Sequence, residues 1–80
     1  MDEMEIRAGV IEILSRIAPE LSPAKLKASL SLREQIELDS MDWLNVVVAL
    51  RERFGIDIPE IDYARLTTLE AIVSYLASKV

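Results

Sequence analysis

The chain has 80 residues, a formal net charge of −5, 51% hydrophobic residues, and no cysteine or histidine. This length allows one compact domain, residues 1–80, with a small core. The missing residue types exclude disulfides, thiolate chemistry and the commonest general base and metal ligand, so we expect no metal site and no self-contained catalysis. The acidic balance disfavours nucleic-acid binding. No apolar run reaches membrane-spanning length and the first residues are acidic rather than signal-like, so a cytoplasmic protein is expected.

Residues 4–17 predict a first amphipathic helix. Its apolar residues recur at helical spacing on one face: Ile6, Val10, Ile13, Leu14 and Ile17. Pro19 predicts an end near Ala18, because proline lacks an N–H and disfavours helical geometry in the residue before it. Residues 19–38 carry two prolines and three serines, but also too many leucines and isoleucines for a freely solvated linker. They predict a long ordered loop packed on the core.

A second long helix is predicted over residues 40–54, with Asp39 as N-cap and Gly55 as its C-terminal stop. Six apolar side chains fall within one arc of roughly 160° that we expect to face the core. They are Trp43, Leu44, Val46, Val47, Leu50 and Phe54. Outside this arc lies a partly apolar stripe that we expect to be exposed. It contains Met41, Asp42, Asn45, Val48 and Glu52.

The last third of the chain predicts one short and one long helix. Residues 55–59 alternate briefly like a strand, but nothing else in the chain could pair with them, so a turn into a short helix over 61–66 is more economical. Residues 67–70 fit a capping box for a final helix. Its apolar stripe comprises Leu69, Ile72, Val73, Leu76 and Val80. The sequence therefore predicts an all-α fold, a small four-helix bundle with three longer helices, one short helix and a long loop after the first.

The pair Asp39-Ser40 at the start of the second long helix has three interpretations. As a dipeptide alone it favours a simple helix cap. A hydrolytic nucleophile is disfavoured, because the chain has no histidine and no lysine between Lys27 and Lys79 to act as base. A modification site is physically reasonable, because a helix start stabilises an attached phosphate by about 0.3–1 kcal/mol when exposed. Ser40 lies at the border of the core arc, where its hydroxyl should be reachable.

The wider pattern resembles the acyl carrier protein family over nearly the whole chain. The matching stretches are LDSMD at 38–42, VVVAL at 46–50, RFGIDIP at 53–59 and LTTL at 66–69. The resemblance implies a four-helix bundle with 4′-phosphopantetheine attached to Ser40 by a phosphopantetheinyl transferase that uses coenzyme A, with Asp39 orienting the serine. The thiol of this arm would hold an acyl group as a thioester. A monomeric carrier, and not an enzyme, is therefore implied.

The resemblance also implies that the helix starting at Ser40 docks on enzymes that load and use acyl groups. Basic patches on these enzymes would meet an acidic, partly apolar surface. The expected partner-binding residues are Met41, Asp42, Asn45, Val48 and Glu52. Two departures from carriers of fatty-acid synthesis stand out: methionine at 41 in place of the usual leucine, and Arg51 and Arg53 in a helix that is usually rich in glutamate.

Several alternatives remain open from the sequence. The cargo could belong to lipid or secondary-metabolite synthesis, or be an aminoacyl group, since the Asp-Ser-Met form also resembles D-alanyl carriers. A helical interaction module with an unmodified Ser40 is the competing class. For Trp43, core packing is favoured over a role against the arm or cargo. Val46, Val47, Leu50 and Phe54 could part to shelter an acyl chain or form a closed core.

Overall fold

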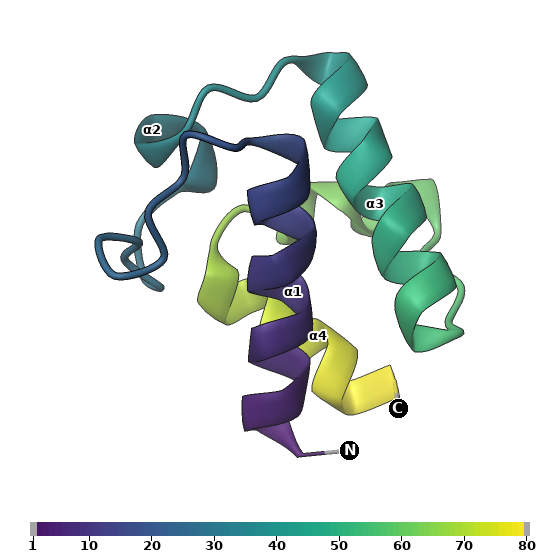
Figure 1. Ribbon diagram of the computed structural model, residues 1–80. Helices are drawn as coiled ribbons and strands as arrows, with labels where there is room; N and C mark the ends of the chain where they lie inside the picture. Colours follow the sequence, from purple (N-terminus) through teal and green to yellow (C-terminus); the bar gives the residue numbers. More distant parts are fainter. Residues whose placement is uncertain (1, 80) are drawn as a thin grey trace.

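The computed structural model describes residues 2–79, and within them three long helices and two short ones enclose a single apolar core. The long helices are α1 (Glu3–Ile17), α3 (Ser40–Phe54) and α4 (Leu69–Lys79), and the short ones are α2 (Leu32–Gln35) and the 3₁₀ helix η1 (Glu60–Arg65). α1 packs against both α3 and α4. Because α1 and α3 run antiparallel, the start of α3 lies at the same end of the molecule as the end of α1 and α2 (Figure 1). The predicted all-α bundle is confirmed.

Helix α1 begins one residue earlier than the periodicity predicts, because Asp2 caps it. The Asp2 carboxylate accepts a hydrogen bond from the Glu5 N–H over 2.8 Å, which satisfies one of the donors left open at a helix start. The helix ends at Ile17 and Ala18 is its C-cap, as Pro19 predicts. The predicted apolar face is buried apart from Ile17, which is half-buried.

Gly9 brings α1 close to the end of α3. It is buried in the helix, and a Cβ atom added to it would lie 2.9 Å from Cζ of Phe54. Glycine in a helix interior costs about 1 kcal/mol relative to alanine. The missing side chain therefore leaves room for the Phe54 ring between the two helices.

The long connection between α1 and α3 is ordered by the side chain of Gln35. Its Oε1 accepts the Lys27 N–H over 2.6 Å, while its Nε2 donates to the carbonyls of Lys27 and Leu30 over 2.8 and 3.0 Å. Leu32 and Ile36 are buried, as expected for a loop packed on the core, whereas Leu30 is exposed. The four-residue helix α2 inside this loop was not predicted.

Backbone contacts fasten the same loop to the start of α4. The Leu32 N–H donates to the Thr67 carbonyl over 2.9 Å, and the Glu70 N–H donates to the Ala28 carbonyl over 3.0 Å. The capping box predicted at residues 67–70 is wrong by one residue, since Oγ1 of Thr68 caps α4 by accepting the Ala71 N–H over 3.0 Å. A capping box at Thr67 would need the Glu70 N–H to donate to the Thr67 hydroxyl, but this N–H donates to the loop carbonyl instead.

The stripe predicted for the last helix is buried at Leu69, Ile72 and Leu76, and half-buried at Val73. Val80 lies outside the described residues. The predicted short helix exists one residue earlier than expected, as η1, and residues 55–59 before it form no strand.

Candidate functional site

The start of α3 is fixed by the side chain of Asp39. Oδ1 of Asp39 accepts the Asp42 N–H over 2.7 Å, and the Asp39 carbonyl accepts the Trp43 N–H over 2.9 Å. These bonds confirm the predicted N-cap. They leave Ser40 as the first residue of the helix, with its side chain exposed. At the other end, Gly55 adopts the left-handed conformation with φ of 62°, as expected for a C-terminal glycine.

An open hollow of about 430 Å³ lies beside Ser40. Its lining residues are Arg33, Glu37, Leu38, Asp39 and Asp42, which include the residue directly before Ser40. The hollow brings three carboxylates and one guanidinium together. An exposed hydroxyl next to open space, at the positive end of a helix dipole, suits a group tethered through a phosphodiester.

The face of α3 that meets the core is narrower than predicted. Val46, Val47 and Leu50 are fully buried, and Trp43 and Phe54 are half-buried against the core. The prediction for Leu44 is wrong, because its side chain is 48% exposed. Leu44 lies at the edge of the predicted arc, about 60° beyond Val47 at 100° per residue, where residues 2–79 leave about half of its side chain uncovered.

Leu44 instead belongs to an exposed apolar stripe along α3. Met41 is 69% exposed and Val48 is 40% exposed, and the spacing of these three residues places them on one side of the helix. Asn45 and Glu52 are also exposed, and Asp42 is half-buried. We name this exposed side of α3 the docking surface, after the partner-binding role expected from the sequence for five of its residues; it comprises Met41, Asp42, Leu44, Asn45, Val48 and Glu52. The exposure predicted for Met41 and Val48 is therefore confirmed.

A second hollow adjoins the docking surface at the C-terminal half of α3. It has a volume of about 350 Å³ and is lined by Val48, Arg51, Glu52 and Ile56. A side chain of modest size could enter it beside Val48. The hollow carries both signs of charge, unlike the mainly acidic surroundings of Ser40.

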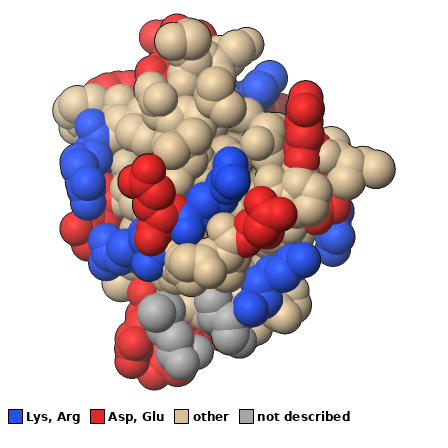
Figure 2. Space-filling model, turned by 90° about the vertical axis from the view of Figure 1, so that its right-hand side faces the viewer, with Lys and Arg blue, Asp and Glu red and all other residues tan. Residues whose placement is uncertain are grey.

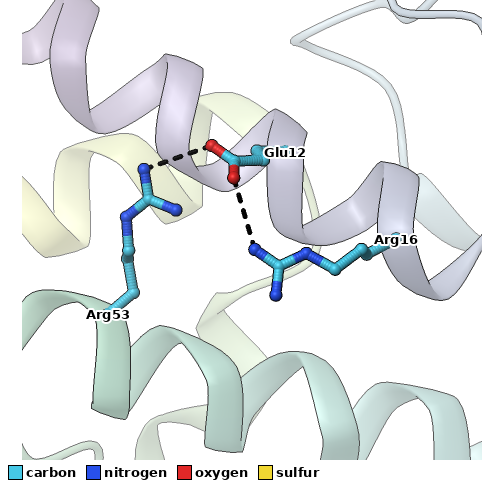
Figure 3. A network of polar contacts seen from close by, with 3 residues as sticks. All are labelled: Glu12, Arg16 and Arg53. Carbon is cyan, nitrogen blue, oxygen red and sulfur yellow. Dashed lines mark hydrogen bonds and ion pairs between the residues drawn. The ribbon is translucent and has the colours of Figure 1, made fainter.

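The basic residues of α3 are partly neutralised by acidic neighbours. Arg53 lies 3.2 Å from Oε2 of Glu12, whose Oε1 lies 3.3 Å from Arg16 (Figure 3). The hydrogen bond and charge of Arg53 hold the pKa of the Glu12 carboxyl below its usual value, with a smaller contribution from Arg16. Arg51 lies 3.5 Å from Asp57. These exposed pairs add little stability, but they determine which charges a partner meets.

A further cavity lies next to Trp43, and no pattern in the sequence pointed to it. It has a volume of about 150 Å³ and is lined by Ser31, Leu32, Arg33, Trp43, Tyr63 and Thr67. The Arg33 guanidinium carbon lies 6.0 Å from the centre of the Trp43 ring. The lining comes from segments far apart in the chain, so no local pattern reveals it. The packing role predicted for Trp43 is confirmed on the side that faces the core.

Comparison with known proteins identifies the family. The sequence model described as "Phosphopantetheine attachment site" matches residues 8–76. The chain belongs to the phosphopantetheine-binding carrier family. An acyl carrier protein from Renibacterium salmoninarum is 34% identical to this chain over 74 residues, which cover 92% of this chain and 90% of the relative. An acyl carrier protein from Rubrobacter xylanophilus is 35% identical over 77 residues, covering 95% and 93%.

The fold agrees with this assignment. The solution structure of a protein assigned as an acyl carrier protein from Anaplasma phagocytophilum superposes on the carrier with a TM-score of 0.84. The two chains are 31% identical, and the match covers 98% of this chain and 91% of the other. These comparisons confirm the resemblance to acyl carrier proteins stated from the sequence. They also confirm a covalently attached 4′-phosphopantetheine and a carrying rather than catalytic role.

Two structural observations bear on other classes of site. Among residues 2–79, no helix has both the length and the apolar character that crossing a bilayer requires. Within the same residues, no cluster of acidic side chains has the arrangement needed to hold a metal ion.

Proposed function

We propose that Ser40 is the attachment residue for 4′-phosphopantetheine. The observation that carries this proposal is an exposed serine hydroxyl at the first position of α3, next to an open hollow, in a chain of the carrier family. The Ser40 Oγ forms a new bond to phosphorus as the pyrophosphate bond of coenzyme A breaks and adenosine 3′,5′-bisphosphate leaves. The hydroxyl proton goes to the phosphopantetheinyl transferase, since this chain has no histidine or cysteine to accept it.

Asp39 supports this role by holding the serine in place. Because one Asp39 oxygen caps α3 through Asp42, the backbone on both sides of Ser40 is fixed, and the hydroxyl is presented from a rigid helix start. Once attached, the arm supplies the thiol that holds an acyl group as a thioester. The chain supplies the anchor and the surface that partner enzymes recognise.

The docking surface on α3 is the proposed contact for partner enzymes. Its apolar stripe provides a small area to bury, while Asp42 and Glu52 attract a basic patch. Figure 2, which views the molecule from the α3 side, shows acidic and basic side chains interspersed rather than one sign filling the face. A fitting partner therefore places positive charge near the Ser40 end and accommodates Arg51 and Arg53 at the other end.

The finer proposal for the cargo is an acyl group of lipid or secondary-metabolite synthesis. An aminoacyl group is the alternative, favoured by the Asp-Ser-Met sequence at residues 39–41. Loading assays with an acyl-activating and an amino-acid-activating enzyme separate the two, because each forms a thioester of different mass. We further propose one carrier domain over residues 1–80 that acts as a monomer in the cytoplasm.

The test is intact mass after incubation with coenzyme A, magnesium and a promiscuous phosphopantetheinyl transferase. The wild type should gain one phosphopantetheine and Ser40→Ala should gain none. Ser29→Ala, which changes an exposed serine of the loop, should be modified like the wild type. If the wild type stays unmodified with several transferases, Ser40 is not the attachment residue. The alternative is then an interaction module that uses the α3 docking surface.

A further inference from the structure

We propose that Trp43 and Tyr63 close the entrance to the core that lies nearest Ser40, so that this carrier serves short acyl groups and leaves long alkyl chains in water. This inference rests on attachment at Ser40, as proposed above, and goes beyond it by assigning the class of cargo and two residues that determine it.

The buried face of α3 begins close to the attachment residue. Trp43 follows Ser40 by three residues, so it lies about 60° around the helix and roughly 4.5 Å along its axis. Val46 and Val47 lie about one further turn along α3, and they and Leu50 are fully buried. A cargo that folds back from Ser40 towards this part of the core therefore meets the half-buried Trp43 ring first.

The cavity beside Trp43 is too small for a long alkyl chain. Its volume of about 150 Å³ is that of a cavity that holds a benzene-sized group, so a chain of more than about six carbons would need the walls to part. Half of the lining residues are polar, namely Ser31, Arg33 and Thr67. Arg33 is exposed, and its guanidinium carbon lies 6.0 Å from the centre of the Trp43 ring. An alkyl chain that enters here would therefore displace water from a charged group without replacing its hydrogen bonds.

The second aromatic wall of this cavity is held in place by a bond to α4. Tyr63 belongs to η1, and the residue before it, Asp62, accepts a hydrogen bond from the Tyr75 hydroxyl over 2.7 Å. Tyr75 is buried, and so is Leu66, which directly follows η1. Moving η1 away from α3 would break this bond and expose buried side chains, and both changes oppose opening of the wall.

The opposite flank of α3, towards α1, is closed as well. The Phe54 ring fills the space that Gly9 leaves, since a Cβ atom there would lie 2.9 Å from Cζ of Phe54. Nearby, Arg53 of α3 reaches Glu12 of α1 over 3.2 Å (Figure 3). A chain inserted between the two helices would add volume to a packed contact, which destabilises proteins. The closed core, and not a parted one, is therefore the form expected when cargo is attached.

Acyl chains of increasing length test the proposal. A transferase that accepts acyl-coenzyme A attaches hexanoyl, decanoyl and tetradecanoyl forms of the arm, each verified by intact mass. Every methylene group withdrawn from water multiplies the folding equilibrium constant about fourfold. In the wild type, urea unfolding should give nearly the same constant for all three forms. The NMR methyl resonances of Val46, Val47 and Leu50 should not move with chain length.

Variants without the rings should reverse this result. In Trp43→Ala, the folding constant of the tetradecanoyl form should exceed that of the hexanoyl form by about tenfold or more, because the opened space admits the chain. The same methyl resonances should then shift. Tyr63→Ala, which removes the other ring, should act in the same direction, while Trp43→Phe and Tyr63→Phe keep a ring and are the matched controls. Comparing two chain lengths within one variant cancels that variant's own loss of stability.

The outcomes distinguish this inference from the proposed function. A wild type whose folding constant rises with chain length overturns the closed entrance and leaves attachment at Ser40 intact. The same holds if chain length has as little effect in both alanine variants as in the wild type, because the two rings then do not determine what the core admits. A protein that gains no arm by mass overturns both.

Discussion

The Tyr75 hydroxyl donates a hydrogen bond to Oδ2 of Asp62 over 2.7 Å and thereby joins α4 to η1. This bond and the burial of Tyr75 raise the pKa of the phenol from 10.0 to about 12. The guanidinium of Arg65 and the ammonium of Lys79 lie over the same ring, 5.6 and 5.4 Å from its centre. Tyr75 thus holds the short 3₁₀ helix η1 against α4.

The raised pKa predicts a loss of stability in alkali. The folded protein keeps Tyr75 protonated more firmly than the unfolded chain does, so this contribution is fully present below pH 10 and is lost as the pH rises toward 12. Tyr75→Phe should cost about 1 kcal/mol at neutral pH and make the alkaline decline shallower. Urea unfolding at a series of pH values measures both. Tyr63→Phe is the control, and an equal change in its alkaline slope would contradict the assignment.

Asp39 has two separable roles at the start of α3. Asp39→Ala should lower stability by about 0.5–2 kcal/mol, because the Asp42 N–H loses its acceptor. Asp39→Asn keeps an acceptor and should leave stability nearly unchanged. If the charge of Asp39 also guides the transferase, both variants should be modified more slowly than the wild type. Thermal unfolding and time-resolved intact mass check this, and an Asn variant modified at the wild-type rate limits Asp39 to capping.

The Gln35 hydrogen bonds predict where the long loop opens. Gln35→Ala should remove the acceptor of the Lys27 N–H and the donor to Leu30, so amide hydrogen exchange should speed up over residues 27–31 while α1 and α4 stay protected. Glu34→Ala changes an adjacent exposed residue and is the matched control. Uniformly faster exchange across the whole protein would mean global destabilisation instead of local opening.

The contact between Gly9 and Phe54 predicts an overpacked variant. Gly9→Val adds methyl groups where a Cβ alone would lie 2.9 Å from the Phe54 ring, and should destabilise the protein by about 1–3 kcal/mol. Ala8→Val, at the exposed neighbouring position, should cost much less. Chemical denaturation measures both. Combining Gly9→Val with Phe54→Ala should recover part of the loss, and strict additivity of the two costs would argue against a clash.

The docking surface predicts a kinetic effect without a stability effect. Met41→Ser removes an exposed apolar side chain, so folding stability should hardly change, while the transferase kcat/KM should fall by about tenfold if Met41 contributes near 1.4 kcal/mol to the encounter. Ile61→Ser removes an even more exposed apolar side chain from η1 and should leave the rate unchanged. Similar losses for both would mean that α3 has no special role in docking.

Local sequence patterns predicted the elements that carry their own signals. α1, α3 and α4 each present a long apolar face at helical spacing, and Asp39, Gly55 and Pro19 mark helix ends by conformational preferences that need no tertiary context. The burial predicted from helical periodicity was wrong at Leu44, because the width of the buried face depends on which neighbours cover it. That information comes from packing and not from periodicity.

Features that depend on distant residues could not be predicted. α2 has only four residues and no side-chain cap. The capping register at Thr68 was shifted because the loop carbonyl of Ala28 engages the Glu70 N–H. The cavity beside Trp43 combines residues from α2, α3, η1 and the segment before α4. For the site, sequence supplied Ser40 and its cap, whereas the position of Arg33 next to both hollows depends on the fold.

The arginines in the C-terminal half of α3 also have a consequence for which enzymes bind the carrier. Arg51 and Arg53 are each within 4 Å of a carboxylate of the same chain, so that region presents charges of both signs and not a uniformly acidic face. An enzyme whose basic surface evolved for a uniformly acidic helix would meet like charge there and dissociate sooner.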